Sequence, residues 1–267
     1  MLMAVNIGNS RISVGFFEKE VCNMLFKFQI STDINKTADE YLALIRTIVN
    51  GSSLSDKKIS GVILASVVPQ LTSTVENCLR MFTGDQPMIV GPGVKTGFAI
   101  KIDSPSELGA DMVANTVAAL SSLKADGAKK APVIIADVDT VTTLSAVNHL
   151  GEYVGCTIFP GMRISLDILH GETAQLPNVM LSAPIKAVGK NSQDAVRSGV
   201  ILGTAMMLDG FVGRFAKEMH CDAEDIRLFM TGEYAKNVID ACRRRFELDE
   251  SLTLRGLYYI YSNSLKK

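Results

Sequence analysis

Short apolar stretches separated by small polar turns mark the beginning of the chain. Residues 2–7 are apolar except for Asn6, the pattern breaks at Gly8–Ser10, and it resumes over residues 12–17. Two apolar stretches on either side of a short polar turn are typical of a β-hairpin. The pattern therefore predicts two antiparallel strands joined at Gly8–Ser10.

Helices and further strands are predicted after this hairpin. Thr37 followed three residues later by Glu40 is the capping-box pattern, and apolar residues then recur at helical spacing. Further elements are expected downstream: a strand at 58–66, a helix from Pro69, a strand at 87–90 and a long helix at 107–123. This alternation of strands and helices indicates an α/β fold.

The strand, turn, strand pattern recurs near the middle of the chain. Residues 133–137 and 143–148 flank a second polar turn, and a shift of about half of the 267 residues places Asn6 on Asp137. Short repeats of this kind also arise by chance. On the pattern alone, either the chain contains two similar halves or the likeness is a coincidence.

Composition and charge limit the classes of partner. The 47% hydrophobic content is enough for one large core or two ordinary ones. Because 27 Lys and Arg residues face 28 Asp and Glu residues, the net charge of −1 provides no global positive field for nucleic acid or anionic lipid. We expect neither nucleic acid nor a membrane as a partner.

The cysteines and the N-terminal residues indicate a compartment. The five cysteines are scattered without a Cys-x-x-Cys pair, which argues against a disulfide framework and against a structural zinc site. The first residues lack the basic region and long apolar run of a signal peptide, and no stretch reaches ~18 uninterrupted apolar residues. A soluble, cytoplasmic protein is expected.

The polar turns and a glycine-rich segment are candidates for chemistry. A turn of small polar residues such as Gly8, Asn9 and Ser10 can hold a phosphate through N–H groups and hydroxyls, while an adjacent acid positions Mg²⁺. The alternative is an ordinary hairpin turn. The three glycines of segment 91–97 either allow close approach of a ligand or form a tight connection, and Lys95 stands in the wrong place for a Walker motif.

A series of short motifs along essentially the whole chain resembles those of the type III pantothenate kinases. The motifs are NIGNS at 6–10, ISTD at 30–33, TADEY at 37–41, SVVP at 66–69, GPGVKTG at 91–97, GAD at 109–111, DVDTVTT at 137–143, PGMRIS at 160–165, TAQLP at 173–177, GKNSQDAVRSG at 189–199 and LTLRGL at 252–257. They occur in the family's order.

The resemblance implies a fold and an activity. The expected fold is a duplicated ribonuclease-H-like, actin-like α/β fold, with domains at 1–125 and 126–267, a site between them, and a homodimer as the assembly. The family transfers the γ-phosphoryl group of ATP to the hydroxyl of pantothenate and forms 4'-phosphopantothenate, the first step of coenzyme A biosynthesis. The implied cofactors are Mg²⁺ and a monovalent cation, K⁺ or NH₄⁺.

The resemblance also implies roles for individual residues. Asp111 would be the catalytic base that accepts the proton of the substrate hydroxyl. The other implied contacts are pantothenate at Gly109, Ala110, Met112 and Thr173, ATP at Asn6, Gly8, Asn9, Ser10 and Thr140, and the monovalent cation at Asp137.

Five residues depart from the family pattern at this implied site. Asn6 replaces an acid, so the charge that draws Mg²⁺ to the turn is missing. Asp139 replaces a phosphate-facing glycine, and its carboxylate would repel phosphate. The other departures are Met112 for an arginine suited to the pantothenate carboxylate, Ile102 for an aromatic residue and Glu233 for a glycine on the adenosine side.

Three functions stay open at this point. The chain is a pantothenate kinase with impaired activity, in which Asp139 could ligate Mg²⁺ in place of an acid at position 6. Alternatively, it is a catalytically inactive paralogue that acts as a binding or regulatory subunit, for example in a heteromer with a motif-complete relative. A third function is an actin-like fold that binds another anion through Lys95, Arg163 and Lys190.

Overall fold

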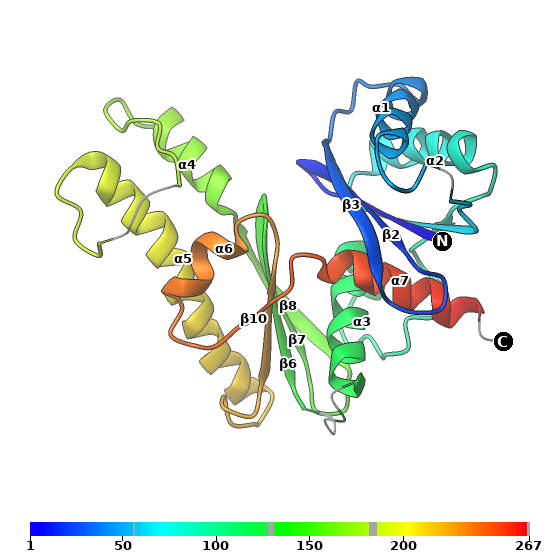
Figure 1. Cartoon of the computed structure of the whole chain (residues 1–267). Coiled ribbons are helices and arrows are strands. Elements are labelled where there is room, and N and C mark those ends of the chain that lie inside the picture. Colours follow the sequence, from blue (N-terminus) through cyan, green and yellow to red (C-terminus); the bar gives the residue numbers. More distant parts are fainter. Residues whose placement is uncertain (56, 126, 128–130, 182–185, 266–267) are drawn as a thin grey trace. The chain divides into compact units, whose positions relative to one another are not determined.

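The structure is a computed structural model that describes residues 1–55, 57–125, 127, 131–181 and 186–265. Contacts divide it into two compact units, and each is described by itself (Figure 1). The first unit comprises Met1–Gly97, Ser104–Ser121 and the C-terminal helix, and the second comprises Phe98–Asp103 and Ser122–Ser251. Compared with the predicted second domain, 126–267, the second unit also includes Phe98–Asp103 and does not include the C-terminal helix.

The first unit is built on a five-stranded sheet. Its order is β3 (Met24–Ser31), β2 (Arg11–Phe17), β1 (Leu2–Ile7), β4 (Gly61–Ser66) and β5 (Met88–Ile89). Strand β2 runs antiparallel to both of its neighbours, whereas β4 is parallel to β1 and β5 is parallel to β4. The predicted hairpin is thus confirmed, and the strand predicted at 58–66 begins only at Gly61.

Local sequence explains how the helices of the first unit begin and end. Helix α1 (Ala38–Asn50) has the predicted capping box, in which the Thr37 hydroxyl accepts from the Glu40 N–H. Helix α2 (Pro69–Thr83) begins with proline at its first position and ends at Gly84, whose positive φ of 79° favours glycine. The remaining helices are η1 (Pro105–Glu107), α3 (Ala110–Ala125) and α7 (Leu252–Leu265).

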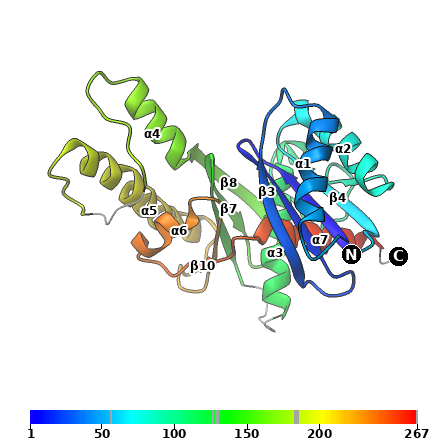
Figure 2. The same ribbon diagram turned by 45° about the horizontal axis from the view of Figure 1, so that its top comes forward.

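Helices cover both faces of this sheet. Helices α1 and α2 lie side by side (Figures 1 and 2), and their buried residues share a core with Phe16 of β2. Gly15 and Phe17 point to the opposite face, where they lie against Leu254 and Tyr258 of α7. This double cover explains why β1 is buried along almost its entire length.

The last helix also packs closely against α3. The Thr253 hydroxyl donates to the Asn115 side-chain oxygen at 2.8 Å. A Cβ at Gly256 would overlap the backbone of Ala114, so only glycine allows this approach. These contacts place α7 in the first unit, although it is the last element of the chain.

The second unit repeats the architecture of the first. Its sheet has the order β10 (Glu247–Leu248), β9 (Arg227–Thr231), β6 (Val133–Val138), β7 (Val141–Val147) and β8 (Tyr153–Pro160). The helices are α4 (Met162–Gly171), α5 (Ser192–Glu218), α6 (Ala235–Val238) and η2 (Ile239–Ala241). Its core consists largely of residues from β6, α5 and β9.

Detailed features of the two sheets correspond. Both sheets pair an antiparallel three-strand meander with two parallel strands in the same order. Each meander has one irregularity, between Phe16 and Phe17 in the first unit and between Ala146 and Val147 in the second. Both irregularities fall at the same distance from the turn, so the prediction of two similar halves in an α/β fold is confirmed.

Candidate functional site

The β1–β2 turn of the first unit is closed by backbone bonds. The Gly8 N–H donates to the Arg11 carbonyl at 2.9 Å, and a Cβ on Gly8 would lie 3.1 Å from that oxygen. Asn9 is exposed, while Gly8 and Ser10 are half-buried. Three of the residues predicted to bind ATP, Gly8, Asn9 and Ser10, therefore lie in one turn.

Asn6 lies at the entrance to this turn. It pairs with Ser13 on one side and Ala65 on the other, and its buried Oδ1 has no hydrogen-bond partner among the described residues. A buried amide oxygen without a partner is costly, and hard cations and water are suitable partners for it. Asn6 can thus supply an oxygen ligand, but no charge.

The β6–β7 turn of the second unit carries two carboxylates. Asp137 occupies the position in β6 that Asn6 occupies in β1, and it pairs with Thr143 and Thr231. Asp139 Oδ1 accepts from the Thr140 N–H at 2.8 Å. The Asp139 carboxylate thereby uses a backbone donor that a phosphate oxygen could otherwise use.

Two glycines bring neighbouring loops against this turn. The Gly161 N–H donates to the Thr140 carbonyl at 3.1 Å, and a Cβ at Gly161 would overlap the Asp139 and Thr140 carbonyls. Gly232, with a φ of 101°, lies against the Val138 backbone in the same way. Gly161 follows β8 and Gly232 follows β9. The β6–β7 turn and both of these loops therefore lie at the same end of the strands of the second sheet.

The first turn of α3 places Asp111 beside a glycine. Asp111 Oδ1 accepts from the Met112 N–H at 2.7 Å, and a Cβ at Gly109 would lie only 2.6 Å from that carboxylate oxygen. The Met112 side chain is buried and lies over Gly109. Asp111 is thus at the N-terminus of a 16-residue helix, where the helix dipole stabilises its charge.

The remaining predicted contacts lie on exposed or irregular segments. Thr173 is exposed just after α4, and its hydroxyl donates to the Leu169 carbonyl at 2.6 Å. Gly93 and Gly97 have φ values of 91° and 80°, as the glycine-rich segment predicts. Ile102 is half-buried in a segment that bridges to β8 through Tyr153.

The predicted site residues come from several segments in each of the two units. Asn6–Ser10 form one group and Gly109–Met112 another, both in the first unit. Asp137 and Thr140 belong to β6 and the turn that follows it in the second unit, and Thr173 follows α4 in the same unit. Thr32, which bonds directly to the Gly8–Ser10 turn, had no predicted role because that contact requires the β1–β2–β3 pairing.

A protein cage for a metal ion is not present in the described part of the chain. No cluster of three or more His, Cys, Asp or Glu side chains has the geometry of a metal site there. Mg²⁺ is commonly bound through one or two carboxylates together with substrate phosphates. The buried Asn6 oxygen of the first unit fits that mode of binding better than an all-protein site.

Comparison with known proteins identifies the family. The family model described as type III pantothenate kinase matches residues 2–214. The chain belongs to the type III pantothenate kinase family. It is 35% identical over 266 residues to the type III pantothenate kinase of an Exiguobacterium species, with all of both chains covered. It is 36% identical over 261 residues to type III pantothenate kinase 2 of Symbiobacterium thermophilum, covering 98% of this chain and 96% of the relative.

Solved structures support the fold. A protein from Campylobacter jejuni, described as a Baf family transcriptional activator, has a TM-score of 0.58 at 15% identity, with 98% of both chains covered. An inorganic polyphosphate/ATP-glucomannokinase from an Arthrobacter strain has a TM-score of 0.50 at 12% identity, again with 98% of both chains covered. At these identities the likeness concerns the fold alone, and the predicted duplicated, actin-like fold is confirmed.

Proposed function

We propose that the chain transfers the γ-phosphoryl group of ATP to pantothenate, at a rate lowered by its altered site residues. The observation that carries this proposal is family membership along the chain together with an intact Asp111 at the start of α3. Family membership supports pantothenate kinase activity and ATP use. The reduced rate is inferred from the residues of this chain that depart from the family pattern at the implied site.

The proposed chemistry assigns a role to each group of residues. Asp111 accepts the proton of the pantothenate hydroxyl as that oxygen attacks the γ-phosphorus, and the main-chain segment at Gly109–Ala110 positions the substrate beside it. Thr173 provides a hydroxyl for pantothenate. Phosphoryl transfer asks the protein mainly for such positioning and for charge neutralisation.

Three substitutions support a lowered rate. Asp139 places a negative charge in a proposed phosphate turn and occupies the Thr140 N–H. Met112 offers a buried thioether where an arginine would pair with the pantothenate carboxylate. Asn6 offers a neutral oxygen where an acid would attract a cation. Each change weakens binding of a charged ligand.

The proposed cofactors are Mg²⁺ and a monovalent cation, K⁺ or NH₄⁺. When bound with ATP, Mg²⁺ would neutralise phosphate charge. Asn6 Oδ1 is a suitable oxygen ligand on the first unit, and Asp137 is the residue proposed to hold the monovalent cation on the second.

A coupled ADP-release assay with pantothenate, ATP, Mg²⁺ and K⁺ tests the proposed activity. The unmodified protein should turn over slowly, and the variant combining Asn6→Asp, Met112→Arg and Asp139→Gly should be faster by at least tenfold. Asp111→Asn in the combined variant is the matched control and should abolish turnover. No turnover in the unmodified protein would contradict the proposed activity.

The second candidate is a catalytically inactive subunit that binds or regulates a partner. It is favoured by the placement of three departures, Asn6, Met112 and Asp139, on charged-ligand contacts while the scaffold glycines Gly161 and Gly232 remain. A silent unmodified protein with an active triple variant would support this candidate. Co-purification with a motif-complete relative would then identify the heteromer.

We also propose a homodimer in the cytoplasm. Gly199, Gly203 and Gly210 leave one face of α5 bare and Met206 is 61% exposed on it, so a second helix can approach closely. Sedimentation analysis checks the dimer.

Among the described residues, α5 is also the helix whose length and composition would suit a membrane span, but its opposite face is buried in the core of the second unit, as in soluble proteins.

A further inference from the structure

Thr32, the first residue after β3, makes two hydrogen bonds to the β1–β2 turn. Its hydroxyl donates to the Gly8 carbonyl at 2.7 Å, and its N–H donates to the Ser10 carbonyl at 3.0 Å. Two of the turn's carbonyls are therefore directed at Thr32. A carbonyl that faced a bound phosphate would repel it, so the direction of these two carbonyls matters for anion binding.

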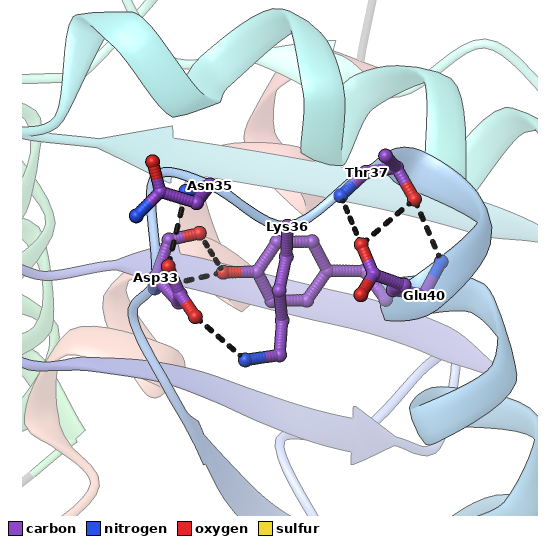
Figure 3. A network of polar contacts seen from close by, with 6 residues as sticks. Asp33, Asn35, Lys36, Thr37 and Glu40 are labelled. Atoms are coloured by element: carbon purple, nitrogen blue, oxygen red, sulfur yellow. Dashed lines mark hydrogen bonds and ion pairs between the residues drawn. The ribbon is translucent and has the colours of Figure 1, made fainter.

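The residues that follow Thr32 are fixed by a network of polar contacts. The Asp33 carboxylate accepts from the Asn35 N–H at 3.0 Å and from the Lys36 ammonium at 2.8 Å, as Figure 3 shows. The Thr37 N–H in turn donates to the Glu40 carboxylate at 2.7 Å. These bonds hold each end of the segment between β3 and α1.

Tyr41 connects this segment to the core. Its side chain is completely buried, and its hydroxyl both donates to the Asp33 carbonyl and accepts from the Asp33 N–H, each at 2.9 Å. The backbone adjoining Thr32 is therefore fixed to a helix that packs on the sheet. Thr32 has little freedom to move away from the turn.

The second unit provides an internal comparison. Gly161 follows β8 as Thr32 follows β3, and its N–H donates to the Thr140 carbonyl at 3.1 Å. The backbone bond is thus common to both units and belongs to the fold. The hydroxyl bond from Thr32 to Gly8 is an addition in the first unit, because glycine has no side chain to donate.

We propose that Thr32 is a positioning residue whose hydroxyl orients the Gly8–Ser10 turn for the phosphates of ATP. This inference rests on the proposed function. By accepting the Thr32 hydroxyl, the Gly8 carbonyl is kept turned away from the anion. Loss of the hydroxyl leaves this half-buried carbonyl without its partner and lets the peptide rotate, which weakens nucleotide binding.

The test compares Thr32→Val, Thr32→Ser and Thr47→Val in the full-length protein. Thr47 is a matched control, because its hydroxyl also donates to a backbone carbonyl, that of Ala43, but on the exposed face of α1. The KM for ATP should rise roughly fivefold to tenfold in Thr32→Val, with the KM for pantothenate unchanged. Thr32→Ser should restore the KM for ATP, and Thr47→Val should leave it within twofold.

Amide hydrogen exchange of the nucleotide-free protein gives a readout that does not need turnover. The amides of residues 8–11 should exchange several-fold faster in Thr32→Val and at the wild-type rate in Thr32→Ser and Thr47→Val. An active wild type with the same KM for ATP in Thr32→Val overturns the inference. An inactive wild type overturns the proposed function instead, and unchanged exchange in the turn would then overturn the role of Thr32 as well.

Discussion

At the scale of single residues, the β1–β2 turn and the β6–β7 turn differ most in charge. Asp139 is the one departure that adds a negative charge to a turn proposed to bind phosphate, and its Oδ1 accepts from the Thr140 N–H. At ~4 Å and an effective dielectric constant of ~20, two unit charges interact by about 4 kcal/mol. An effect of this size would dominate the affinity for ATP.

Replacing this carboxylate by its neutral isostere should strengthen ATP binding. Asp139→Asn keeps the oxygen that accepts from Thr140 and removes the charge, so we expect the KM for ATP to fall at least tenfold. Steady-state kinetics with varied ATP measure it. Asp225→Asn removes an exposed charge elsewhere in the second unit and should change nothing. An unchanged KM in Asp139→Asn would show that the carboxylate does not face the phosphates.

A single methyl group added at Gly161 should displace the β6–β7 turn. The new Cβ of Gly161→Ala would overlap the Asp139 and Thr140 carbonyls, so the backbone must shift. We expect a loss of about 1–3 kcal/mol in the free energy of unfolding and weaker ATP binding. Urea unfolding and ATP titration measure the two effects. Gly171→Ala, where a Cβ has open space, is the control that should leave both unchanged.

At the scale of elements, the segment between β3 and α1 should be sensitive to acid. Hydrogen bonding from Lys36, followed by the Asn35 N–H, lowers the pKa of Asp33, and bonds from Thr37 lower the pKa of Glu40. Both carboxylates therefore bind fewer protons in the folded state. Their stabilisation is fully present above the unfolded pKa values of about 4, and it is lost as the pH falls through the lowered folded values.

The double variant Asp33→Asn with Glu40→Gln tests this dependence. At pH 7 the double variant should have a lower Tm than the wild type. The difference in Tm should shrink between pH 5 and pH 3 as the wild-type carboxylates become protonated. Thermal unfolding followed by circular dichroism at several pH values measures it. Asp240→Asn with Glu107→Gln, two exposed carboxylates without a side-chain hydrogen bond or ion pair among the described residues, provides the control. A constant difference in Tm would contradict the assignment.

Elements with local causes could be predicted from the sequence. The cap of α1 depends on Thr37 and Glu40, three residues apart, and the first hairpin depends on adjacent stretches around Gly8. Strand β3 was not predicted, because it is half-exposed and carries polar residues such as Lys27 within it. The contact of Thr32 with the turn likewise depends on strand pairing, so motif spacing could not reveal it.

At the scale of the whole molecule, chain order and spatial order differ. The sequence placed residues 252–267 in the second domain because they follow it, whereas α7 contacts β1, β2 and β4 of the first unit. That packing depends on Gly256 lying against Ala114, two residues separated by more than half of the chain. The sheet of the first unit therefore lacks one of its covering layers until the C-terminal residues have folded onto it.

Filling the close approach between α7 and α3 should destabilise the first unit. A Cβ at Gly256 would overlap the Ala114 backbone, so Gly256→Ala must push the helices apart, and we expect it to lower the free energy of unfolding by at least about 2 kcal/mol. Gly213→Ala in α5 is the matched control, since a Cβ there has open space and alanine favours a helix by about 0.5–1 kcal/mol.

Hydrogen exchange of the Gly256→Ala protein locates the damage. Amides of β1 and β4, which α7 covers, should lose protection, whereas those of β6 and β9 should keep it, because the second unit has its own core. Equal loss of protection in both sheets would mean that the two units unfold as one cooperative body. Wild-type stability in Gly256→Ala would mean that α7 does not pack against α3. Equal loss in both sheets would contradict independent unfolding of the two units but not the packing of α7 against α3. The experiment therefore tests these two ideas separately.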